Sequence, residues 1–91
     1  MSPTAVDRYR NTQEVGSHAD SDELVAGMLI RYDYGSTALV ILESPHAGGW
    51  HGSHCMGGFH FVHDNGWSRR LYHATSLDHE IWDECAKWRK P

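Results

Sequence analysis

The feature that most constrains the fold is a pair of apolar runs joined by a short turn. Residues 24–34 (LVAGMLIRYDY) and 37–44 (TALVILES) are rich in apolar and β-branched side chains, and turn-forming residues 33–36 lie where they meet. Two such runs predict an antiparallel β-hairpin. Up to Arg31, both alternating sets of side chains in the first run are largely apolar, so we expect this strand to be covered on both faces.

A second hairpin is predicted in residues 58–74 (GFHFVHDNGWSRRLYHA). Asn65 and Gly66 favour a two-residue turn, because both turn positions require a positive φ. That turn would place His60 opposite Leu71 in the ladder. The glycine-rich residues 45–58 between the two hairpins are predicted to form a loop. Four short antiparallel strands of this kind fit a small barrel better than an open sheet.

Residues 75–90 are predicted to form a helix. Thr75 and Asp78 have the spacing of a capping box, in which each side chain bonds the backbone of the other. Four apolar residues recur at helical spacing and would form one stripe: Leu77, Ile81, Cys85 and Trp88. We expect this stripe to pack on the barrel and the polar face of the helix to be solvated.

The chain of 91 residues is long enough for one domain. Residues 1–23 show few large apolar side chains and no periodic pattern, which predicts a disordered acidic tail ahead of a single domain in residues 24–91. Eight Lys and Arg against twelve Asp and Glu give a net charge of −4, which argues against nucleic-acid and membrane partners. Without an apolar run of about 20 residues or a signal-peptide pattern, we expect a cytoplasmic protein.

The first hairpin resembles a known class of small barrels. Residues 27–35 (GMLIRYDYG) followed by residues 37–43 (TALVILE) are similar to the first hairpin of SH3-like and Tudor-like barrels, which opens with an apolar strand after a glycine. The resemblance implies a mainly β (α+β) fold, with a small barrel of four to five antiparallel strands and a C-terminal helix. It contains no diagnostic motif and implies no functional residue.

Histidines are concentrated in one part of the chain, since seven of the eight fall within residues 46–79. Imidazole and thiolate groups are ligands that suit zinc, nickel or copper. On the predicted hairpin register, His60 and His73 would be diagonal neighbours on one face. We expect no cofactor, but a Zn-binding protein that uses residues 46–63 is the alternative. Its candidate ligands are His51, His54, Cys55, His60 and His73.

A small Cys/His enzyme is a further alternative, with Cys55 as nucleophile and His54 or His60 as its base. Adjacent residues in an extended segment point in opposite directions, so His54 is poorly placed to activate Cys55. The sequence also has no phosphate-binding loop, dinucleotide fingerprint, zinc-protease motif or nucleophile elbow. We therefore predict no catalytic residue.

Aromatic and basic residues in the second half of the chain favour binding to another protein. Trp, Tyr and Arg dominate the binding energy of protein interfaces. The candidate partner-binding residues are Trp50, His51, His54, Trp67, Arg69 and Arg70. The sequence thus predicts a non-catalytic protein-binding module, with another protein or a second copy of the chain as partner. Short acidic chains without motifs are common among phage and mobile-element accessory proteins, so we expect it to inhibit a host factor by occupying its surface.

Overall fold

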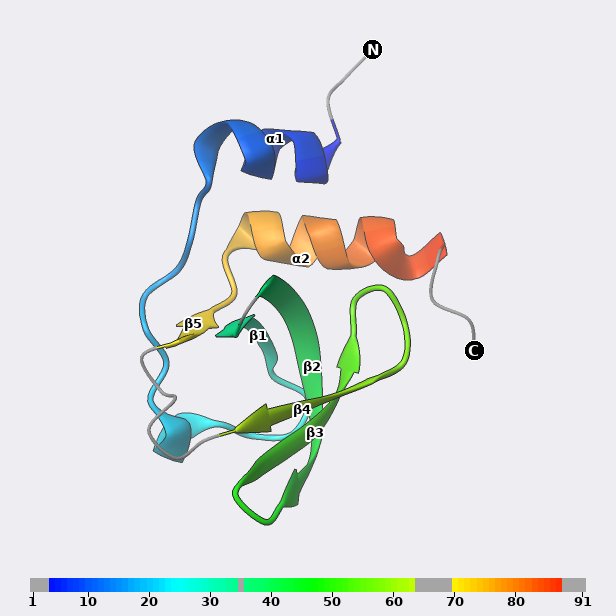
Figure 1. The fold of residues 1–91 in the computed structure, drawn as a ribbon. Helices are drawn as coiled ribbons and strands as arrows, with labels where there is room; N and C mark the ends of the chain where they lie inside the picture. Colours follow the sequence, from blue (N-terminus) through cyan, green and yellow to red (C-terminus); the bar gives the residue numbers. More distant parts are fainter. Residues whose placement is uncertain (1–3, 35, 64–69, 88–91) are drawn as a thin grey trace.

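The computed structural model describes residues 4–34, 36–63 and 70–87. Two helices and five strands make up this part of the chain (Figure 1). Two short 3₁₀ turns, η1 and η3, accompany them. In chain order the elements are α1 (Ala5–Thr12), η1 (Ser21–Glu23), β1 (Leu29–Tyr34), β2 (Ser36–His46), β3 (Gly49–His54), β4 (Phe59–His63), β5 (Leu71–His73), α2 (Ser76–Glu84) and η3 (Cys85–Lys87).

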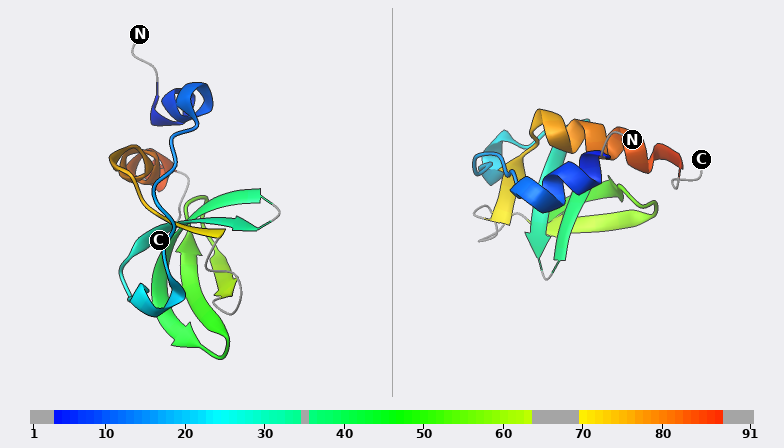
Figure 2. Two further views of the ribbon diagram at one scale, coloured as in Figure 1. Left: turned by 90° about the vertical axis from the view of Figure 1, so that its left-hand side faces the viewer. Right: turned by 90° about the horizontal axis from the view of Figure 1, so that it is seen from above.

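The five strands form one antiparallel sheet in the order β4-β3-β2-β1-β5. The predicted α+β class, with four to five antiparallel strands and a C-terminal helix, is confirmed, although the structure has a second helix, α1, that was not predicted. The prediction of a closed barrel is wrong: β4 and β5 are the two edges of the sheet, and no ladder joins them within the described residues. Both helices lie on one side of this open, curled sheet (Figure 2).

The β1–β2 hairpin is confirmed, and its strand β1 is covered on both faces as predicted. Ile30 pairs with Val40, and both side chains belong to a buried cluster on the face away from the helices. Leu29 and Leu39 belong to a second buried cluster, shared with the helices. Strand β1 begins at Leu29 rather than at residue 24, because a turn with Gly27 at φ 90° precedes it.

The predicted loop over residues 45–58 is wrong, because most of this segment continues the sheet. Strand β2 extends to His46, and β3 covers Gly49–His54. Glycine in this segment marks close packing as well as turns. A Cβ atom at Gly52 would clash with Val40 Cγ1 and the Ile41 carbonyl oxygen, and one at Gly49 with the Val62 carbonyl oxygen.

The predicted pairing of residues 59–63 with 69–72 is also wrong. Strand β4 pairs with β3, and β5 pairs with β1, where Leu71 lies opposite Tyr32. His60 and His73 are therefore on opposite edge strands and are not diagonal neighbours. The turn predicted at Asn65 and Gly66 falls outside the described residues. A turn signal fixes only local geometry, whereas the choice of partner strand depends on contacts distant in sequence.

Helix α2 confirms the predicted C-terminal helix, but its α-helical part, Ser76–Glu84, is shorter than the predicted residues 75–90 and continues as the 3₁₀ turn η3. Thr75 and Asp78 form the capping box, with both reciprocal hydrogen bonds present. The side chains of Leu77, Ile81 and Cys85 are buried against the sheet, and Trp88 lies outside the described residues. The prediction of a fully solvated polar face fails at Asp78, which is completely buried.

The segment predicted as a tail contains helix α1, which packs against α2 (Figure 1). The α1 side chains of Ala5, Val6 and Tyr9 join the helix-side cluster. The Ala5 N–H donates to the Glu84 carboxylate at 2.5 Å. The sequence did not predict this helix, because the helix is only eight residues long. Helices this short depend on tertiary packing rather than on intrinsic helix propensity.

We expect Tyr9→Ser to lower the free energy of unfolding by about 1–3 kcal/mol, because it removes apolar burial and a ring stacked on Arg31. The Tyr9 ring centroid lies 4.1 Å from the Arg31 guanidinium carbon. Arg10→Ser, at the exposed next position, is the matched control and should change stability little. Urea unfolding measures both variants, and equal midpoints would contradict the docking of α1.

Within the described residues, no helix is both long enough and apolar enough to cross a membrane.

Candidate functional site

The predicted partner-binding residues that the structure describes do not all lie on one face of the sheet. Trp50 and His51 are neighbours on β3 and so face opposite sides of the sheet; Trp50 packs on the cluster away from the helices. His54 lies at the end of β3. Arg70 is exposed, and its Nη1 donates to the Asp33 carbonyl at 3.2 Å. Two further predicted residues lie outside the described ranges: Trp67 and Arg69.

The predicted metal ligands are also dispersed. The His54 and His60 rings are 5.7 Å apart, whereas Cys55 packs on the helix-side cluster. His73 lies on β5, where its Nε2 contacts the Glu23 carboxylate, and His51 lies on the other face of β3. Over residues 4–34, 36–63 and 70–87, no three His, Cys, Asp or Glu side chains are grouped to hold a metal ion. The Zn-binding alternative and the pairing of Cys55 with His54 or His60 therefore gain no support from geometry.

The environment of His60 favours its neutral form. Its ring meets the buried Tyr32 ring edge-on, with centroids 5.4 Å apart. Burial, and to a smaller extent the adjacent His54, lower the pKa of His60 below the usual 6.5. His60 is therefore held as a neutral ring in the folded protein at neutral pH.

This shift predicts that acid weakens the fold through His60. The unfolded chain protonates His60 near pH 6.5 and the folded protein only at lower pH, so stability falls as the pH drops through 6.5. We expect His60→Gln to reduce this decline in melting temperature between about pH 7.5 and 5.5. His79→Gln, at an exposed position on α2, should keep the wild-type slope. A His60→Gln slope as steep as that of the wild type would contradict the assignment.

A compact group of rings lies on the helix-side face of the sheet. The group is at the end of this face that is distant from the helices. His46 on β2 and His51 on β3 have ring centroids 4.4 Å apart. Phe61 on β4 lies 5.7 Å from His46 and 5.4 Å from His51, and His63 lies 4.7 Å from Phe61. We call these four residues, with the neighbouring Phe59, the His–Phe face.

Strand register explains why these rings meet. His51 pairs directly with Phe61, and Gly49 lies between His46 on one side and His63 on the other. Because Gly49 has no side chain, the flanking rings can lie over the strand between them. The β2–β3 hairpin extends away from the two helices (Figure 1), so its distal part is not covered by them.

Exposure distinguishes the His–Phe face from the two cores. Phe59 is 81% exposed, the highest value among the large apolar side chains of the described residues. His46 is exposed, whereas His51, Phe61 and His63 are half-buried. Of these five residues, only His51 was predicted as a partner-binding residue. The alternation Phe59–His60–Phe61 could have indicated the others, had residues 49–54 been taken as a strand.

Comparison with known proteins gives no relative: no protein-family model matches the chain, and no curated protein and no solved structure matches it significantly.

Proposed function

We propose that this protein is a non-catalytic protein-binding module whose partner contacts the His–Phe face. The observation that carries the proposal is the exposure of Phe59, at 81%, beside a group of mutually contacting rings. Exposed apolar patches on soluble domains mark interaction sites, and aromatic residues are enriched at protein interfaces.

The contacts among the rings of the His–Phe face support this proposal. His51 and Phe61 hold each other at 5.4 Å and both contact His46. Side chains already fixed by their neighbours lose little conformational entropy on binding, which favours affinity. The β-sheet beneath them supplies a rigid support.

Strand β4 supports it in a second way, because β4 is an edge strand of the sheet within the described residues. An edge strand can pair its backbone with an extended segment of a partner, while alternate side chains provide specificity. Phe59 and Phe61 alternate along this strand and would give a partner two apolar contacts on one face. Inhibition of a host factor remains a prediction from sequence alone.

A pair of photocrosslinking variants tests the proposal. Benzoylphenylalanine replaces Phe59 in one variant and Val25 in the other, since Val25 is also exposed, at 59%, but lies outside the His–Phe face. In lysate of the source cells, we expect the variant at position 59 to give a protein adduct that the variant at position 25 does not. Equal adducts from both positions, or none from position 59, would count against the site.

The adduct identified by mass spectrometry then allows a direct measurement with purified components. We expect the double variant His51→Ala, Phe61→Ala to weaken binding by about tenfold or more, as loss of interface anchors does. A comparison of the single variant His51→Ala with the double variant His51→Ala, His54→Ala separates the two faces of β3. Because His54 lies on the face opposite to His51, the double variant should weaken binding little more than the single variant does. Circular dichroism melts confirm that each variant is folded, and unchanged affinity in a folded His51→Ala, Phe61→Ala variant would refute the proposal.

A further inference from the structure

A pocket of about 410 Å³ lies on the helix side of the sheet, away from the His–Phe face. Its walls come from α1 through Tyr9, from the following segment through His18, and from strands β1, β2 and β5. This volume falls at the small end of the range for small-molecule sites, about 300–1,000 Å³. The pocket is therefore the right size for a compact ligand.

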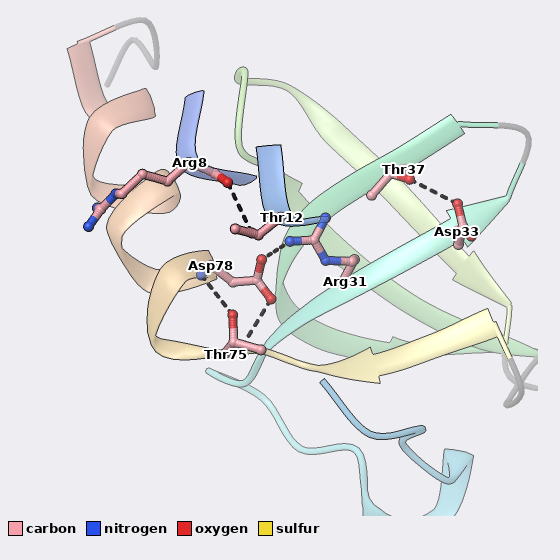
Figure 3. A network of polar contacts seen from close by, with 7 residues as sticks. All are labelled: Arg8, Thr12, Arg31, Asp33, Thr37, Thr75 and Asp78. Carbon is pink, nitrogen blue, oxygen red and sulfur yellow. Dashed lines mark hydrogen bonds and ion pairs between the residues drawn. The ribbon is translucent and has the colours of Figure 1, made fainter. Parts of the chain in front are cut away.

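Arg31 gives the pocket a buried hydrogen-bond donor. Its side chain is 3% exposed, and its Nη2 donates to the Asp78 carboxylate (Figure 3). Its Nε is buried and has no hydrogen-bond partner among the described residues. The Tyr9 ring covers the guanidinium at 4.1 Å. A guanidinium has five N–H donors, so Arg31 keeps donor capacity after its contact with Asp78.

Asp33 provides an acceptor two residues further along the same face of β1. Thr37 on β2 donates its hydroxyl to Asp33 Oδ1 at 3.0 Å, as Figure 3 shows. This bond orients the carboxylate and leaves its second oxygen able to accept another hydrogen bond. Residues i and i+2 of a strand are about 7 Å apart along the chain, a separation that one small polar ligand can bridge.

The pocket also has an aromatic wall. The His18 and Tyr72 rings lie 5.0 Å apart at an interplanar angle of 52°. A backbone bridge between the same two residues attaches the His18 segment to β5. With Tyr9 on another side, three of the lining residues have rings. Such walls favour planar ligands that can stack.

We propose that this pocket binds a neutral planar heterocycle with a carbonyl group next to an N–H, as in uracil-type and guanine-type bases. The carbonyl accepts from Arg31, the N–H donates to Asp33, and the ring stacks on His18. An anionic ligand is disfavoured, because Asp78 already neutralises Arg31 and Asp33 adds a further negative charge. The site is independent of the protein-binding proposal, since its residues are separate from the His–Phe face.

Uridine and 3-methyluridine are the matched probes for this site. The methyl group of 3-methyluridine replaces the N–H hydrogen from which Asp33 would accept a hydrogen bond. Titration into ¹⁵N-labelled protein should give saturable shifts for uridine at residues 16–18, 31–33 and 72. We expect 3-methyluridine to bind at least about tenfold more weakly, as loss of a hydrogen bond to a charged group predicts. Equal binding of both nucleosides, no saturable binding of uridine, or shifts at other residues only would overturn the assignment.

Two pocket variants test the proposal without substituting the buried Arg31. Asp33→Ala should weaken uridine binding about tenfold or more, and His18→Ala, at an exposed position, about fivefold or more through lost stacking. His79→Ala on the exposed side of α2 is the control and should bind like the wild type. Thermal melts establish that each variant is folded. Wild-type affinity in both folded pocket variants would refute the proposal.

Discussion

Asp78→Ala is expected to lower the free energy of unfolding by about 3–5 kcal/mol, because it leaves the Arg31 charge buried without a counterion. Arg31 and Asp78 are 3% and 0% exposed and form a direct ion pair. Burial lowers the pKa of the Arg31 guanidinium, which means that the charged form is already disfavoured there. Urea unfolding followed by far-UV circular dichroism measures the loss.

Asp78 also caps helix α2, so its two roles must be separated. Its Oδ2 accepts from the Thr75 N–H, and the Thr75 hydroxyl accepts from the Asp78 N–H. Thr75→Ala removes the hydroxyl half of this cap and should cost about 1 kcal/mol. The double variant Arg31→Leu, Asp78→Leu removes both charges and should recover much of the loss. A cost for Asp78→Ala no greater than that for Thr75→Ala would contradict a structural role of the ion pair.

The elements that could be predicted from the sequence are those with dense local signals. The β1–β2 hairpin has two apolar runs around one turn, and its register confirms the pairing. Helix α2 combines a capping box with a stripe at helical spacing, and both are present. In each case the residues that specify the element are within the element, so the local pattern was sufficient.

The elements that were missed depend on contacts distant in sequence. Arg31 and Asp78 are separated by 47 positions, and no local pattern marks Asp78 as buried. Strands β4 and β5 occupy opposite edges, a choice made by their neighbours β3 and β1. A glycine can mark either a turn or a place where packed groups come close to the backbone. Gly52 is of the second kind, because a Cβ atom there would clash with Val40.

For the same reason, only His51 of the His–Phe face is among the predicted partner-binding residues. His51 was predicted as a partner-binding residue, but its ring neighbours His46 and Phe61 come from two other strands. Treating residues 45–58 as a loop removed the register that places these rings together. Once the ladder of β3 with β4 is known, His51 lies opposite Phe61, so the missed strand β3 also concealed this group of rings.

The second large effect is expected for Ile81→Asp, which should unfold the domain or lower its free energy of unfolding by more than about 4 kcal/mol. Ile81 is 7% exposed and lies in the cluster that joins α2 to α1 and to the sheet. A carboxylate there would be desolvated among apolar side chains. The loss of melting temperature and of dispersed amide resonances measures the effect.

Two further substitutions show whether the effect comes from burial of the charge rather than from helix propensity. Ala86→Asp introduces the same residue at an exposed position in η3 and should change stability by no more than about 0.5 kcal/mol. Ile81→Val keeps the position apolar and should cost about 0.5–1.5 kcal/mol. If Ile81→Asp had a melting temperature close to that of Ala86→Asp, α2 would not be docked through this stripe. The helix-side core, including the packing of α1 against α2, would then have to be rejected.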